Sequence, residues 1–272
     1  AEDVVAPGLM PGSTLTRDNL DAGAYSEWVD GEEKVIMGDG REFSPEWLIW
    51  TEKSTPGHSG RAFGKSDKAG IRHLRIGFVS PMPIGTVLAK GGGQLSVLKP
   101  GATYPGNLGD DAEWIPAQRL VDGKVSSAPV AINQTVAWVL PPGTSSQALR
   151  FTHESTTTDP KYEGQIGGVL VLAERFENVA PSATVAALSG NERAGKINNE
   201  IADIWSAWEN MENSKQPGDA PLISASHPEW VLLVWREPVT LRGLVALFAG
   251  FGSADVQVFT GPDSIHPRDG AE

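Results

Sequence analysis

The sequence predicts an all-β protein, and three observations support this. Turn-forming residues are abundant, with 31 glycines and 20 prolines among 272 residues, a density that suits many short strands better than long helices. Short apolar runs recur between turn clusters, and several alternate apolar with polar residues, as in VAWVL and ALRFTH. With 40% hydrophobic residues and 9 tryptophans, the chain also has ample material for packed cores.

The expected strands follow one another from residue 46 to residue 175. Turn signals at Pro141–Gly143 and Asp159–Pro160 separate the later ones. The strand-like runs are Glu46–Thr51, Ile71–Val79, Gly85–Leu88, Gln94–Leu98, Glu113–Arg119, Thr135–Leu140, Ala148–His153 and Gly167–Arg175.

One later segment has the pattern of a helix instead. Ser189 and Glu192 have the spacing of a capping box. Apolar residues then recur at helical spacing, which predicts a helix from about residue 189 to residue 208. These residues are Ile197, Ile201, Ile204, Trp205 and Trp208.

The last part of the chain repeats part of its first half. Matching segments in the same order predict a duplicated domain. We place copy one at 13–175, a linker at 176–190 and a partial copy two at 191–272, which lacks a counterpart of 114–175. The matches are Tyr25–Trp28 with Trp205–Trp208, Ser44–Trp50 with His227–Trp235, Ile71–Phe78 with Leu241–Phe248, Gln94–Leu98 with Asp255–Phe259, and Asp110–Glu113 with Asp269–Glu272.

A half sandwich would expose strand edges and an apolar face. We therefore expect copy two to be disordered, to be completed by another chain or by a missing C-terminal segment, or to be a shorter true domain. A complete, well-packed sandwich formed by 191–272 alone would show that the repeat alignment is wrong.

Charge and composition limit the partners and the location. A net charge of −12 and a pI of about 4.9 argue against a general nucleic-acid binder, because phosphate contacts need a basic face. No apolar run is long enough to span a membrane. The chain has no cysteine and begins Ala1-Glu2-Asp3 without an initiator methionine, so we expect a secreted, periplasmic or cell-surface protein.

The order of these signals resembles the discoidin domain, also called the coagulation factor 5/8 type C domain, of the galactose-binding-like superfamily. Copy one carries the resemblance at Asn19, Asp21, Trp28, Trp47–Ile49, Leu74–Ile76, Leu95–Val97 and Trp114. Copy two carries it at Asn199, Trp208, Trp230–Leu232, Leu244–Ala246 and Val256–Val258. Two features depart from the family: Asp30-Gly31 follows the first tryptophan instead of preceding it, and the terminal disulfide of many animal members is impossible here.

The resemblance implies an antiparallel jelly-roll β-sandwich followed by a partial second sandwich of the same type. It also implies a domain that is usually non-catalytic, often with a structural calcium ion. Loops at one end of the family's sandwich bind glycans, lipid headgroups or protein partners.

The segment Thr51–Gly70 is the main candidate ligand site. Copy two connects the equivalent strands with only Arg236–Thr240, and long loops without secondary structure are often functional. An anionic ligand, such as a sulfated or uronic-acid glycan, would be drawn to this basic region. The alternative is a solvated loop that pairs with the acidic body or a neighbouring domain. The basic residues of this segment and the following strand are Lys53, His58, Arg61, Lys65, Lys68, Arg72, His73 and Arg75.

Trp28, beside a predicted loop, is a candidate platform for stacking on a sugar, whereas we expect tryptophans within strands to be core. Asp110, Asp111 and Glu113 form a carboxylate cluster that offers oxygen ligands to a hard cation such as calcium. The alternative is a solvated turn.

Catalytic motifs are scarce. The sequence contains no H-E-x-x-H pair and no G-x-S-x-G elbow, although the fold can still bring two carboxylates together as in a glycosidase. The sequence therefore favours a non-catalytic recognition module of a secreted protein, with a carbohydrate or cell-surface matrix component as ligand. The alternative is a structural spacer or scaffold domain of a larger secreted enzyme or surface protein.

Overall fold

The computed structural model of the chain describes residues 19–29, 31–35, 61–62, 70–91, 93–131, 134–155, 165–201, 229–246 and 255–261. The chain divides into two compact units. The first comprises Ala1–Asn178 with Leu241–Ala249, and the second comprises Val179–Thr240 with Gly250–Glu272. The boundary after Asn178 lies within 176–190, the segment that we predicted to be a linker, whereas Leu241–Ala249 of the predicted copy two belongs to the first unit.

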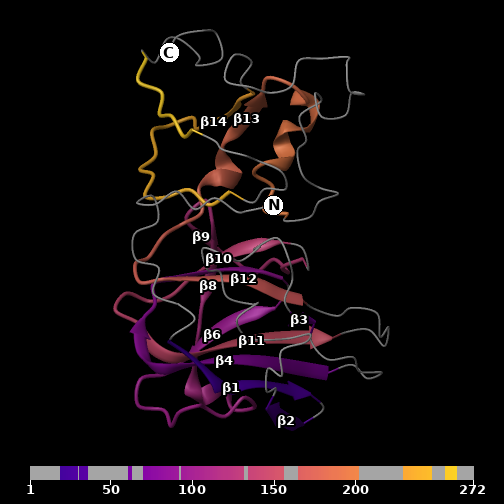
Figure 1. Cartoon of the computed structure of the whole chain (residues 1–272), viewed down its shortest axis with the longest axis vertical. Coiled ribbons are helices and arrows are strands. Elements are labelled where there is room, and N and C mark those ends of the chain that lie inside the picture. The colour runs from indigo at the N-terminus through magenta and orange to yellow at the C-terminus, as the bar shows by residue number, and fades with distance from the viewer. Residues whose placement is uncertain are drawn as a thin grey trace. The chain divides into compact units, whose positions relative to one another are not determined.

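The first unit contains two six-stranded sheets, and every strand pair within them is antiparallel (Figure 1). This confirms the predicted all-β class. The first sheet has the order β2-β1-β4-β11-β6-β7, from Glu32–Val35, Leu20–Val29, Gly70–Pro83, Ser145–Ser155, Gln94–Leu98 and Trp114–Pro116. The second has the order β3-β12-β5-β10-β8-β9, from Arg61–Ala62, Gln165–Leu172, Thr86–Lys90, Thr135–Val139, Gln118–Val121 and Lys124–Ser126.

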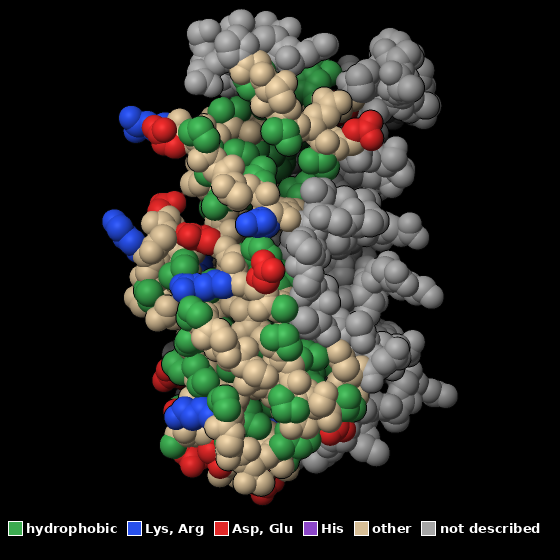
Figure 2. Space-filling model, turned by 90° about the vertical axis from the view of Figure 1, so that its left-hand side faces the viewer, with side chains coloured by type: hydrophobic (Ala, Val, Ile, Leu, Met, Phe, Trp, Pro, Cys, Tyr) green, Lys and Arg blue, Asp and Glu red, His purple; other side chains and the backbone are tan. Residues whose placement is uncertain are grey.

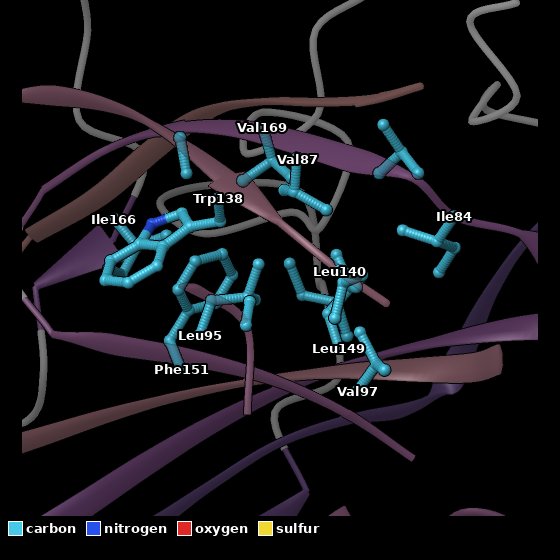
Figure 3. Close-up of a cluster of buried hydrophobic side chains, with 14 of the residues drawn as sticks. Ile84, Val87, Leu95, Val97, Trp138, Leu140, Leu149, Phe151, Ile166 and Val169 are labelled. Atoms are coloured by element: carbon cyan, nitrogen blue, oxygen red, sulfur yellow. The ribbon is translucent and has the colours of Figure 1, made fainter. Parts of the chain in front are cut away.

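The main core lies between these two sheets. Alternate residues of a strand point to the same face, so Leu74, Ile76 and Phe78 of β4 all enter the core and are at most 1% exposed. Figure 3 shows Leu95 and Phe151 of the first sheet facing Trp138 of the second. The alternation of apolar and polar residues, from which we predicted the strands, therefore also places their apolar side chains in the core.

A second, smaller apolar cluster covers the outer face of the first sheet. Leu108 from the segment 99–113 packs there with Leu98, Trp114 and Ala148, and all four are buried. Tyr104 also joins this cluster and donates a hydrogen bond to Asp21 Oδ2 over 2.6 Å. The segment 99–113 therefore forms a strap across the sheet, and we call it the strap.

The strap approaches the sheet so closely that one sheet position must be glycine. A Cβ atom added to Gly77 of β4 would lie 2.3 Å from Ala24 Cβ and 2.4 Å from Tyr104 Oη. Real Cβ atoms do not come that close to other heavy atoms, because the repulsion is prohibitive. A side chain at position 77 would thus collide with both the neighbouring strand β1 and the strap.

The second unit contains a two-stranded antiparallel sheet. β13 (Thr184–Ala187) pairs with β14 (Val231–Val234), with Ala187 opposite Val231. Near the start of this unit, the Trp235 indole Nε1 donates to Val179 O over 2.8 Å. The expected strand at Trp230–Leu232 is therefore present in part as β14.

The predicted capping box does not form. Ser189 instead binds the Glu229 carboxylate through both its backbone N and its hydroxyl, at 3.1 and 2.6 Å. Gly190 occupies the N-cap position of a short 3-10 helix, η4 (Asn191–Lys196), and makes no side-chain cap. A carboxylate that is distant in sequence thus outcompetes the local cap, and residues 202–208 of the predicted helix lie outside the described ranges.

Candidate functional site

One end of the sandwich in the first unit holds an open pocket of about 300 Å³. The pocket is formed by the start of β6, the end of β11, and the β8–β9 hairpin with the segment that follows it. Strand β10 contributes the inner wall. The lining residues are Gly93, Gln94, Arg119, Ser126, Ser127, Ala128, Pro129, Val130, Trp138, Thr152, His153 and Glu154.

Strand register explains why these residues meet. Gln94 lies opposite Thr152, and Arg119 lies opposite Trp138. Cross-strand partners point to the same face of a sheet, and Trp138 belongs to the core, so Arg119 also faces the space between the sheets. The Gln94 amide donates to Ala117 O over 2.7 Å, which fixes its orientation at the rim.

The pocket combines an apolar wall with several polar groups. Trp138 is only 3% exposed, so the wall is a continuation of the core. Around it lie a guanidinium, an imidazole and a carboxylate, from Arg119, His153 and Glu154, as well as two serines. This mixture suits a small polar ligand that has one apolar face.

Trp28 lies at the same end of the sandwich but on the outer face of the first sheet. Its ring is 5.3 Å from the His73 ring, tilted by 52°. His73 Nδ1 in turn lies 2.8 Å from the Thr152 hydroxyl, and Thr152 lines the pocket. Trp28 is half-buried and packs against the strap cluster, so it is only partly available to a ligand.

The described residues of the predicted basic segment Thr51–Gly70, which are Arg61, Ala62 and Gly70, lie at the pocket end. Arg61 pairs with Ile166 at the start of β12, and Gly70 pairs with Ser155 at the end of β11. The described residues that flank positions 63–69 therefore lie at the same end of the sandwich as Gln94 and Glu154. The other predicted ligand residues, His58, Lys65 and Lys68, lie outside the described residues, as does Lys53.

Three of the basic residues in this prediction are not surface charges. Arg72, His73 and Arg75 of β4 are 1%, 5% and 2% exposed. Arg75 donates to the Glu33 carboxylate over 2.5 Å and to the carbonyls of Ala24 and Gly106 over 3.0 and 2.8 Å. These three side chains therefore add nothing to an exposed basic surface, because strand alternation and the strap bury them.

His73 carries no charge at neutral pH. Burial and, to a smaller extent, the nearby Arg150 guanidinium lower its pKa to about 4. On the face shown in Figure 2, the described Lys and Arg side chains are interspersed with Asp and Glu, and they do not form a patch of one sign.

The predicted metal cluster is engaged with protein groups. Asp110 caps the 3-10 helix η2 (Asp111–Glu113) by accepting from Ala112 N over 2.9 Å. Glu113 accepts from Asn107 N, and Asp111 accepts from Arg150 Nη2, both over 2.6 Å. Within the described part of the chain, no three His, Asp or Glu side chains are placed to hold a metal ion, so the predicted calcium site gains no support from this arrangement.

Arg150 holds the strap against the first sheet. It is 5% exposed, and it donates to Ser96 Oγ over 3.0 Å and to Leu108 O over 2.9 Å. Its guanidinium carbon also lies 4.8 Å from the centre of the Trp114 ring, within cation–π range. The sequence analysis did not identify Arg150 as a buried residue, because an arginine in an alternating strand is normally expected to face solvent.

Comparisons with known proteins found no match: no family model, no curated protein and no solved structure is similar to this chain. The discoidin resemblance therefore depends on the sequence motifs alone. Among the helices that the structure describes, none is long and apolar enough to cross a membrane.

Proposed function

We propose that the first unit is a non-catalytic recognition module of a secreted protein that binds carbohydrate in the pocket between Gln94, Arg119 and Trp138. The single observation that carries this proposal is the pocket itself, in which the apolar residues Ala128, Pro129 and Val130 lie among hydrogen-bonding side chains at one end of a sandwich. A sugar ring needs both parts, because it has an apolar C–H face and hydroxyls on its edge.

The size of the pocket supports a small saccharide. Its volume of about 300 Å³ is at the lower end of the usual range of ligand sites. Arg119 provides planar donors for a carboxylate or sulfate, and Glu154 provides acceptors for hydroxyls. An acidic sugar would also be drawn to the predicted basic residues Arg61, Lys65 and Lys68.

The test is calorimetric titration of the chain with galactose, glucuronic acid and a sulfated oligosaccharide. We expect saturable binding of at least one of them. Arg119→Gln or Glu154→Gln should weaken it about tenfold, which corresponds to about 1.4 kcal/mol and is typical of one hydrogen bond to a charged group. Binding of an acidic sugar should also weaken with added salt.

Glu174→Gln is the matched control. Glu174 is exposed and lies beside Gly85, where β5 begins, which is the opposite end of the sandwich from the pocket. This substitution should leave the affinity unchanged. Equal loss in all three variants, or no saturable binding of any saccharide, would reject the pocket as a sugar site and favour the alternative of a spacer domain.

A further inference from the structure

The outer face of the second sheet is apolar and is covered. In β5, Val87 and Ala89 point into the main core, so Leu88 points to the outer face. Leu88 lies opposite Ala137 of β10 and opposite Leu170 of β12, and cross-strand partners share a face. Leu170 and Ala137 are only 5% and 8% exposed, so other residues of the chain shield this face from water.

A distant segment of the chain takes part in this cover. Leu170 and Leu172 of β12 form a buried apolar cluster, and the half-buried side chains that pack against it are those of Leu88, Phe176 and Val245. Phe176 follows β12 closely in the chain. Val245, in contrast, comes from a segment that lies between two parts of the second unit in the sequence.

The segment that carries Val245 belongs to the first unit, although its neighbours in the sequence do not. Leu241–Ala249 is part of the first unit, and the residues on either side, 179–240 and 250–272, make up the second. The chain therefore crosses between the units three times, after residues 178, 240 and 249. A single crossing is enough to join two units, so the second and third crossings serve to bring this segment to the first unit.

The exposure of the side chains in this segment identifies Val245 as the residue that docks. Leu241 and Leu244 are 51% and 41% exposed, whereas Val245 is half-buried against the cluster. The sequence repeat matches this segment with β4, but residues 241–246 form no strand. The segment therefore contacts the face of the second sheet through a side chain and does not extend the sheet by a further strand.

We propose that residues 241–249 are a latch, which closes over the outer face of the second sheet through Val245 and ties the second unit to the first. The main core lies on the opposite face of this sheet, so the latch opens while the two sheets stay packed. Local opening of a segment with few buried contacts costs less free energy than global unfolding. With the latch open, the chain joins the two units only after residue 178, and the second unit gains freedom of movement.

The latch is separate from the proposed saccharide site. The backbone N of Gly85 donates to Leu172 O over 2.8 Å, and Gly85 lies at the end of the sandwich opposite the pocket. The cluster under the latch therefore extends toward that end. Opening of the latch needs no ligand in the pocket, and its test uses none.

The test measures the thiol reactivity of single cysteines in the full chain, which has no cysteine of its own. Leu170→Cys reports exposure of the covered face, and Val97→Cys, at a core position that is 0% exposed, reports opening of the sandwich. Val245→Asp should speed labelling of Leu170→Cys at least about tenfold, because a carboxylate is not retained in an apolar contact. It should change labelling of Val97→Cys less than about twofold.

Two further variants complete the test. Leu244→Asp is the matched control, because it adds the same charge one residue away at an exposed position, and it should change labelling of Leu170→Cys less than about twofold. Val245→Ala removes the contact without adding a charge, and it should act in the same direction as Val245→Asp by a smaller factor.

The following results would overturn the proposal. Unchanged labelling of Leu170→Cys in the Val245 variants, or equal acceleration by Leu244→Asp, would show that Val245 does not close this face. Equal acceleration at Val97→Cys, with Val245→Ala as well as with Val245→Asp, would show that the segment opens only together with the whole sandwich. Labelling of Leu170→Cys that slows as the protein concentration rises would identify a second copy of the chain as the cover.

Discussion

Replacement of Arg150 by alanine should release the strap from the first sheet. Arg150 is the buried side chain that links Ser96 of the sheet, Leu108 of the strap and the Trp114 ring. Its remaining partner, Asp111, has a side chain that is 87% exposed. The two ends of this ion pair therefore differ in how much each contributes to stability.

The geometry gives the expected size of the effect. A hydrogen bond from a charged donor contributes about 1.5–3 kcal/mol, and a cation–π contact adds about 0.5–1 kcal/mol. Arg150→Ala loses the two buried bonds, the exposed bond to Asp111 and the ring contact; the lower ends of these ranges for the buried bonds and the ring contact alone give a loss of about 3–4 kcal/mol. Asp111→Asn should cost at most about 1 kcal/mol, because water replaces an exposed partner.

Amide hydrogen exchange separates the two variants. In Arg150→Ala, the amides of β6 and the strap should exchange about 10²- to 10³-fold faster, since 1.4 kcal/mol is a factor of ten. In Asp111→Asn they should change less than tenfold. The reasoning fails if Asp111→Asn accelerates exchange as much as Arg150→Ala, or if Arg150→Ala changes it less than tenfold.

Two further predictions concern the same face of the sheet. Gly77→Ala should destabilise the first unit by about 1–3 kcal/mol in urea unfolding, because its Cβ would meet Ala24 and Tyr104. Gly70→Ala has open space around its Cβ and should stay within about 0.5 kcal/mol; an equal loss in both would refute the steric argument. His73 has a folded-state pKa of about 4, against 6.5 for an exposed histidine, so the unfolded chain takes up a proton first as the pH falls. Its contribution to stability is complete above pH 6.5 and decreases between pH 6.5 and pH 4. His73→Gln should flatten that part of the stability profile, and an unchanged profile would show that another group is responsible.

The strands of the main core were predictable because their apolar residues alternate. Leu74, Ile76 and Phe78 enter the core as period two requires, and the expected burial of Trp114 and Trp138 is confirmed. The first strand of the structure, β1, was not predicted. Its sequence LDAGAYSEWV has small and polar residues at positions such as Ala24 and Ser26, which are buried by the strap and by β2.

The candidate pocket, unlike the core strands, could not be predicted from the sequence. The pocket joins residues from β6, β8, β10 and β11, which meet only through long-range register. Arg72 and Arg75 were counted with the basic residues that would attract an anionic ligand, but both are buried. A buried arginine with several partners has no local signal, since those partners, such as Glu33 and Gly106, are distant in sequence.

The most direct test of the recognition function is an NMR titration of the labelled chain with the best-binding saccharide. The account predicts saturable shifts of the Trp138 indole, the Arg119 guanidinium and the Gln94 amide, all at the pocket end. Shifts that cluster instead around Gly85 and Glu174, at the other end of the sandwich, or no saturable shifts at all, would contradict it.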